Sequence, residues 1–255
     1  MALIIDDNKV NTTINNVKMY YEIIFNENLK DVDVFASTDI DLDTRNFVNF
    51  EENTKPNGRY IEPNSITQKS IILTRYEAYY KNGCTAVSTL IHELTHYSDY
   101  KKYTNQYCDG DYSKTRKQSN FSGFYIWSEY HAYINQIIHL RRYLSVALND
   151  NDFMNENIIK EEMTEYQLPY YKQNLVESLE IGESFNITSI IKYCARFYVC
   201  NYYNKELKIE ENVPEVVYEI FPDIVKLYYD LYPLQSYEAA SKKFLILSLL
   251  LRDFI

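Results

Sequence analysis

The pentapeptide His92-Glu93-Leu94-Thr95-His96 is the sequence feature that most constrains what the chain can fold into, because these residue types can act together at this spacing only on an α-helix. Residues four apart on a helix lie about one turn apart on the same face, so His92 and His96 can bind one metal ion. Glu93 is rotated by about a quarter of a turn and can hold a water molecule beside the metal. The chain has only 4 histidines in 255 residues, and two of them are here. The motif therefore predicts a helix with a zinc-binding face.

The helix around this motif is predicted to run from Thr85 to about Tyr103, after a break at Asn82-Gly83. One side of its helical wheel is apolar and should pack on the core; it carries Ala86, Val87, Leu90 and Leu94. The opposite side should face a cleft; it carries Ser88, Thr89, His92, His96 and Asp99. Asp99 either accepts a hydrogen bond from a ligating imidazole or is a solvated aspartate near a helix end, and the sequence leaves both open.

A catalytic zinc site needs a third protein ligand and an open position for water. The candidates are Glu129 and His131, which differ by about 200° on a helical wheel and cannot both face one metal. The Glu129 face is mostly apolar, with Tyr125, Ile126, Ala132, Tyr133, Gln136 and Leu140. An acidic group buried there would need a compensating charge, which zinc supplies.

The His131 face carries Ser128, Asn135 and Arg142 beside Phe124 and Trp127, and we expect it to lie closer to solvent. We therefore predict Glu129 as the third ligand, with His131 as the alternative. A surface carboxylate paired with a basic side chain is the other interpretation of Glu129. His139, further along the same helix, is expected on a polar face.

The rest of the pattern predicts an α+β, predominantly helical fold with a small mixed sheet near the N-terminus. The chain has 5 glycines and 6 prolines, which leaves few turn signals. Helical spacing covers 11–29, strands are expected over 31–37, 59–62 and 70–74, a turn lies in 51–58, and 104–120 is predicted to be a surface loop. A long helix over about 121–148 precedes helices over 152–166, 169–180, 187–204, 214–231 and 235–253. A boundary near residue 150 would separate a catalytic part, 1–150, from a helical part, 151–255.

Composition limits the classes of partner that the chain can bind and indicates its cellular compartment. A net charge of −10 and a pI of about 5.0 disfavour sequence-independent binding to nucleic acid or to an anionic membrane. The start of the chain shows no secretory pattern, and the apolar stretch 244–251 is too short to cross a bilayer. The 4 cysteines are scattered, which does not suggest a disulfide scaffold. We expect a cytoplasmic protein that binds neither nucleic acid nor membrane.

The motif residues resemble those of zinc metallopeptidases of the glutamate-zincin kind. Residues 92–96 have the same letters as the motif of thermolysin-like peptidases, and the helix with Glu129 resembles their third-ligand helix. The segment around Glu129 is also similar to that of small intracellular bacterial and phage peptidases of the ImmA/IrrE type. The resemblance covers about residues 70–140. The chain departs from it at Tyr133, where thermolysin-like enzymes have an Asp, at Thr95, where the ImmA/IrrE motif has a glycine, and in having no Asn before Glu129.

The resemblance implies a zincin-like catalytic core, with Zn²⁺ bound by His92, His96 and Glu129 and with Glu93 as general base. It implies a hydrolase, an endopeptidase that cleaves protein or peptide substrates, and a substrate strand paired with the edge of 70–74. Tyr103, Tyr125 and Tyr133 are candidates for an oxyanion donor. Two alternatives remain open: a zincin-fold binding or regulatory protein with little turnover, and a helical interaction protein whose motif is accidental. The presence of Glu93 favours the enzyme, because a purely structural site needs no base.

Overall fold

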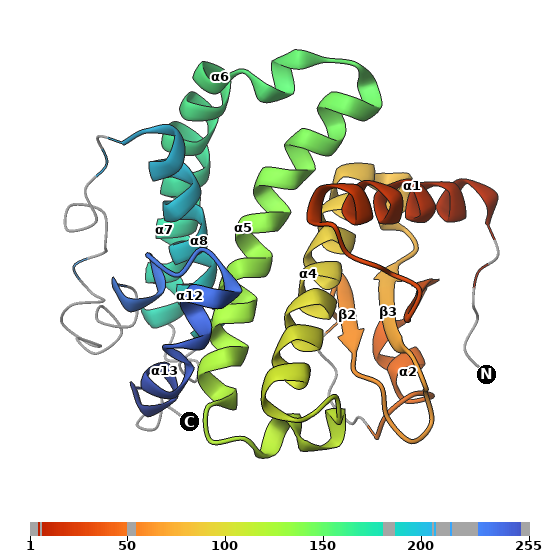
Figure 1. Cartoon of the computed structure of the whole chain (residues 1–255). Helices are drawn as coiled ribbons and strands as arrows, with labels where there is room; N and C mark the ends of the chain where they lie inside the picture. Colours follow the sequence, from red (N-terminus) through yellow and green to blue (C-terminus); the bar gives the residue numbers. More distant parts are fainter. Residues whose placement is uncertain are drawn as a thin grey trace. The chain divides into compact units, whose positions relative to one another are not determined.

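The structure is a computed structural model that describes residues 5, 7–49, 55–180, 187–205, 207, 215 and 229–250 (Figure 1). The chain forms two compact units, Met1–Arg116 and Lys117–Ile255. The first contains a small sheet and several helices, and the described part of the second is helical. The predicted class, α+β and predominantly helical with a helical C-terminal part, is confirmed.

The sheet of the first unit has three strands in the order β1-β3-β2. They are β1 (Val32–Ser37), β2 (Gly58–Ile61) and β3 (Ser70–Arg75), which confirms the three predicted strands. β1 runs parallel to β3 with Val32 opposite Ser70, and β2 runs antiparallel to it with Gly58 opposite Thr74. Since β3 is central, both of its edges are already hydrogen-bonded. The prediction that a substrate strand pairs with residues 70–74 is therefore wrong, and β1 and β2 form the edges of the described sheet.

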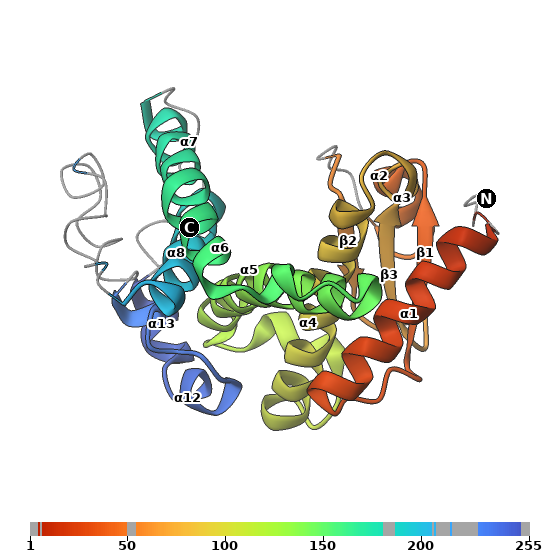
Figure 2. The same ribbon diagram turned by 90° about the horizontal axis from the view of Figure 1, so that it is seen from above.

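Side-chain caps fix where three helices of this unit begin. In α1 (Asn8–Phe25) the Asp7 carboxylate accepts hydrogen bonds from the backbone N–H groups of Lys9 and Val10. Asp39 caps the short α2 (Ile40–Thr44) in the same way, and α3 (Ala78–Lys81) follows β3. Asn82 accepts from the N–H of Thr85 at the start of α4 (Gly83–Tyr107). α4 packs against β2, β3 and α1, so the helix that carries the histidines is anchored to the sheet (Figures 1 and 2).

The predicted surface loop over 104–120 is wrong for much of its length. α4 continues through Tyr107, and the 3-10 helix η1 spans Tyr112–Lys117. Two polar residues of this stretch, Thr104 and Thr115, are buried, and their hydroxyl oxygens lie 3.4 Å apart. Because each hydroxyl can satisfy the other, polar residues that suggest a loop fit inside the fold.

The second unit is built around α5 (Phe121–Leu148), which packs against α8 (Ile187–Tyr203) and α13 (Phe244–Leu250). Between α5 and α8 lie the 3-10 helix η2 (Asn151–Met154), α6 (Glu156–Glu161), the π-helix η3 (Glu162–Gln167) and α7 (Leu168–Glu180). The short α12 (Tyr237–Ser241) precedes α13. This division differs from the predicted boundary near residue 150, because α5 packs with the helices that follow it.

The predicted helices at 152–166 and 169–180 form one continuous helical run from 156 to 180. Pro169 is the second residue of α7, just after the π-helical stretch η3, where the missing N–H is tolerated. Most of the predicted helix 214–231 lies outside the described residues. Among the described helices, none is both long enough and apolar enough to cross a bilayer.

Candidate metal centre

The two histidines of the motif converge on one point beside α4. Their Nε2 atoms are 3.1 Å apart, the ring centroids are 4.7 Å apart and the ring planes are inclined by 82°. Two imidazole nitrogens bound to one tetrahedral zinc ion are about 3.3 Å apart, given ordinary zinc–nitrogen bond lengths. The same distance suits an N–H···N hydrogen bond between the rings. With both Nε2 atoms unprotonated, however, His92 and His96 direct two lone pairs at one position, as the helical spacing predicts.

The surroundings of this pair are more enclosed than the helical wheel predicts. The apolar side of α4 is buried as expected, with Leu90 and Leu94 fully inaccessible. The opposite side, predicted to face a cleft, is buried as well: Ser88, Thr89, His92, His96 and Asp99 are each at most 9% exposed. Electrostatic interactions are stronger in such a site than in water, because fewer water molecules screen them.

Asp99 is fully buried, so the interpretation of this residue as a solvated aspartate is wrong. It lies one turn after His96 on α4, where a carboxylate is in range to orient a ligating imidazole. That hydrogen bond stays a prediction.

Glu93, the predicted base, is 7% exposed and lies against the start of β2. A Cβ atom built on Gly58 would be 2.8 Å from Glu93 Oε1 and 2.4 Å from Thr89 Cγ2. The backbone of Gly58 therefore forms one wall of the Glu93 environment. The sequence predicts only a turn at Gly58, within 51–58. A glycine at a strand is also a signal that another part of the chain approaches the backbone closely.

Two tyrosines extend the aromatic surroundings of His96. The ring of Tyr100 meets that of His96 edge to face at 6.4 Å, and Tyr60 of β2 lies 5.2 Å from Tyr100. Neither was predicted. Among the predicted oxyanion donors, Tyr103 is fully buried, and burial raises its pKa, so its hydroxyl keeps its proton. Tyr125 is exposed, and the Tyr133 ring lies under the Lys192 ammonium at 5.6 Å. Of the three, Tyr103 is the one that is fully buried, and its role as an oxyanion donor stays a prediction.

Glu129 and His131 both lie on α5, in the second unit, and the predicted difference in burial between them is not found, because both side chains are half-buried. Ile126 and Ala132 on the Glu129 face are buried as predicted. Glu129 is half-buried and its neighbour Tyr125 is 41% exposed. Phe124, Trp127 and Ser128 on the His131 face are fully inaccessible. The cause is packing from far along the chain: the Trp127 indole N–H donates to the carbonyl of Leu234 at 2.8 Å, and its ring packs on Tyr237 and Phe244.

His131 is held by neighbours on its own helix. Its ring stacks on Trp127 with centroids 4.8 Å apart, and its Nε2 lies 3.1 Å from the side-chain nitrogen of Asn135. The amide contact engages Nε2, and the stacking on Trp127 holds the ring against its own helix, which favours a packing role for His131. His139 was predicted on a polar face; it is buried, with Arg142 and His131 as electrostatic neighbours.

By ligand type, the predicted set fits a catalytic zinc ion. His92, His96 and Glu129 each offer one ligand atom, and two imidazoles with one carboxylate are the donor set of many hydrolytic zinc sites. The histidines belong to the first unit and Glu129 to the second, so the assignment of Glu129 stays a prediction.

Comparisons with protein-family models, with curated proteins and with solved structures find no match for this chain. The resemblance to zincin peptidases thus has no support beyond its motif residues. The function of the protein has to be inferred from the chemistry of its residues.

Proposed function

We propose that this chain is a zinc-dependent peptidase, an endopeptidase of protein or peptide substrates, in which His92, His96 and Glu129 hold the metal. The observation that carries the proposal is the pair of buried Nε2 atoms 3.1 Å apart with the Glu93 carboxylate next to them in the helix. A site that only stabilised the fold would not need a carboxylate at this position. This chemistry is also what the resemblance to zincin peptidases implies.

The residues of the site have distinct roles in this proposal. Bound zinc would polarise the scissile carbonyl and make a water molecule more acidic. Glu93 accepts the proton of that water and passes it to the leaving amine, which needs a carboxylate that is ionised and held in place. A buried hydroxyl such as that of Tyr103 would supply a donor for the developing oxyanion.

The sheet suggests where an extended substrate would lie. Both edges of β3 are occupied, so an added strand can pair only with β1 or β2. β2 is the edge strand that contacts α4, and its first residue touches Glu93. We therefore move the expected substrate strand from residues 70–74 to β2.

The acidic composition supports a protein substrate in preference to nucleic acid or a membrane surface. At a net charge of −10 the chain repels other polyanions. We place the protein in the cytoplasm, with the scattered cysteines reduced. Of the four cysteines, Cys84 is exposed and the other three are buried as free thiols.

One observation favours a second candidate function. The three motif residues are each less than 10% exposed, which leaves little room for a substrate to reach them. A zincin-fold binding or regulatory protein with little turnover would tolerate such burial.

Metal analysis and one substitution separate these functions. We expect near-stoichiometric zinc in the purified protein, and a Glu93→Gln variant that keeps the zinc but cleaves an unstructured protein about 100- to 10,000-fold more slowly. A protein without zinc would rule out both functions. Zinc with no detectable cleavage by the unmodified chain would favour the regulatory protein, and an active Glu93→Gln variant would rule out the assigned base.

The third ligand is tested by a matched pair of variants on the same helix. Glu129→Ala should weaken zinc binding, because it removes one of three protein ligands, whereas His131→Ala should leave the affinity unchanged. Both are measured by competition with a chromophoric chelator. Weaker binding only in the His131 variant would show that the assignment is wrong.

A further inference from the structure

The position of Glu93 depends on the backbone of β2, because Gly58 leaves no space between the strand and α4. A Cβ at this residue would lie 2.4 Å from Thr89 Cγ2, 2.8 Å from Glu93 Oε1 and 3.0 Å from Glu93 Cγ. Carbon atoms that are not bonded to each other stay about 3.5 Å apart or more, so a side chain here would push Thr89 and Glu93 aside. Conversely, a shift of β2 would change the space that the Glu93 carboxylate occupies.

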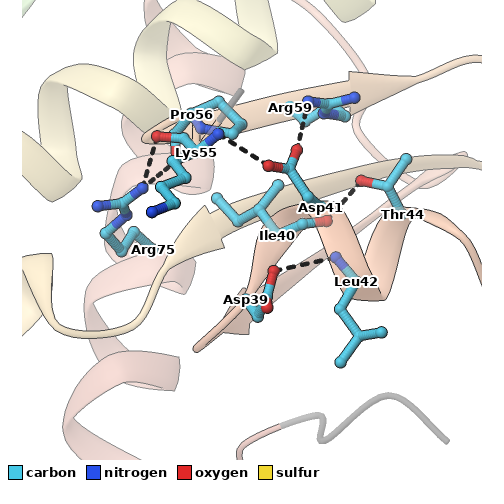
Figure 3. A network of polar contacts seen from close by, with 9 residues as sticks. All are labelled: Asp39, Ile40, Asp41, Leu42, Thr44, Lys55, Pro56, Arg59 and Arg75. Carbon is cyan, nitrogen blue, oxygen red and sulfur yellow. Dashed lines mark hydrogen bonds and ion pairs between the residues drawn. The ribbon is translucent and has the colours of Figure 1, made fainter. Parts of the chain in front are cut away.

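A network of polar contacts holds the turn that leads into β2 (Figure 3). The Asp41 carboxylate accepts the backbone N–H of Lys55 at 2.7 Å and the guanidinium of Arg59 at 2.9 Å. Arg75 donates to the carbonyls of Lys55 and Pro56 at 2.6 and 2.8 Å. The chain from 55 to 59 is thus held by a carboxylate on one side and by a guanidinium on the other.

The turn needs such contacts because its backbone is strained. Lys55 has a φ of 45°, in the left-handed region that side chains other than glycine seldom adopt. A residue in that region persists only when surrounding contacts determine its conformation. The Asp41 and Arg75 contacts at Lys55 meet this requirement.

The network is tied to the rigid part of the first unit. Asp41 lies on α2, which Asp39 caps through the N–H of Leu42. The preceding residue, Ile40, belongs to a buried cluster with Ile61 of β2 and with Ile71 and Leu73 of β3. The side chain of Asp41 is only 6% exposed, so water competes little for its contact with Arg59. The Asp41 carboxylate therefore links the start of β2 to the buried cluster that contains Ile40.

We propose that Asp41 is a positioning residue for Glu93: it fixes the turn 55–57 so that Gly58 lies against the Glu93 carboxylate and keeps that carboxylate in the orientation the reaction needs. The proposal rests on the proposed function for its catalytic consequence. Its geometric part, the dependence of Glu93 on Asp41 and Gly58, stands without it. Asp41 acts on Glu93 through the strand, as a positioning residue.

Two variants with matched controls test the proposal. Asp41→Asn leaves one acceptor oxygen fewer for Lys55 and Arg59, and its control is Asp33→Asn, which makes the same change in an exposed ion pair on β1. Gly58→Ala inserts the obstructed Cβ, and its control is Gly83→Ala, whose Cβ would meet no described atom within 4 Å. Circular dichroism and zinc content first establish that each variant folds and keeps its metal.

We expect Asp41→Asn and Gly58→Ala to lower kcat about 10- to 100-fold, because a misplacement of about 1 Å at a catalytic group has effects of this size. KM and zinc content should stay unchanged, and both controls should match the unmodified protein. A kcat that stays unchanged in both variants would overturn the proposal. A lower kcat together with a higher KM and lost zinc would overturn it as well, because this is the result that a merely structural role predicts.

Crystal structures of the same variants provide a readout that does not require turnover. The Glu93 carboxylate should be displaced in Asp41→Asn and in Gly58→Ala but not in the controls. If the unmodified protein neither binds zinc nor cleaves peptides, the proposed function fails while this measurement still decides the geometry. A Glu93 carboxylate that stays in place in both variants would overturn the positioning role.

Discussion

His139 is a buried histidine whose surroundings oppose protonation. Burial, and to a smaller extent the charges of Arg142 and His131, lower the pKa of His139 from 6.5 to about 4. In the unfolded chain the imidazole regains its ordinary pKa, so between these two values the unfolded state binds more protons than the folded state. The free energy of unfolding therefore falls as the pH drops through this window. Between pH 7 and pH 5 the loss from this residue amounts to about 2 kcal/mol.

A His139→Gln variant should lack this contribution. Trp127 is the only tryptophan, lies on the same helix as His139 and is fully buried, so its fluorescence reports unfolding of the second unit. Urea unfolding at pH 7 and pH 5, followed by this fluorescence, should show a smaller pH effect in the variant than in the unmodified protein. Equal pH effects in the two proteins would contradict the assignment.

Single residues also show what the sequence can and cannot predict about the site. The convergence of His92 and His96 follows from a spacing of four on one helix, so it was predictable without any other part of the chain. The contact of Gly58 with Glu93 joins residues that are far apart in the sequence, and the register of β2 decides it. The glycine at a strand signals a close backbone approach but not which residue is approached, and nothing around Asp41 indicates its role, so both were missed.

Helix packing in the second unit depends on a glycine. Gly123 of α5 lies so close to α13 that an added Cβ would be 2.0 Å from the carbonyl oxygen of Phe244 and 2.8 Å from the nitrogen of Ser248. Its own N–H donates to the Ser248 hydroxyl at 2.8 Å. Because the obstacles are backbone atoms, no rotation of a side chain can make room, and the two helices would have to move apart.

Gly123→Ala should therefore destabilise the second unit by about 1 to 3 kcal/mol, the usual cost of overpacking. Urea unfolding followed by Trp127 fluorescence measures the change. Gly83→Ala is the control, since its Cβ meets no described atom within 4 Å, and it should leave this transition unchanged. Equal stability of the two variants would show that α5 and α13 separate without cost.

The elements divide into those that local pattern determines and those that it does not. The strands were predictable because they are β-branched runs bounded by turn residues. The central place of β3 was not, because it depends on pairing with β1 and β2, which both precede it in the chain. The two faces of α5 both carry apolar residues. Packing of Leu234, Tyr237 and Phe244 against Trp127 contributes to burying the His131 face, and a wheel of one helix contains no such information.

For the molecule as a whole, composition predicts the helical fold class but not the division into Met1–Arg116 and Lys117–Ile255. The polar run 149–152 suggests a boundary, yet the chain there begins another short helix of the second unit. A boundary depends on which surfaces pack together, and this is a property of distant residues. The proposed ligands come from both units, which gives the division a measurable consequence.

Zinc should stabilise the second unit although both histidines belong to the first. If Glu129 completes the site, metal binds the folded protein only when both units are folded. At a free zinc concentration about 100 times the dissociation constant, binding then adds about 2.7 kcal/mol to the free energy of unfolding.

Since Trp127 lies on the same helix as Glu129, its fluorescence transition in urea should move to higher urea concentration on adding zinc and back on adding a chelator. Glu129→Ala should abolish this shift and His131→Ala should preserve it. Zinc that binds tightly without moving the Trp127 transition would confine the metal to the first unit and exclude Glu129 as a ligand.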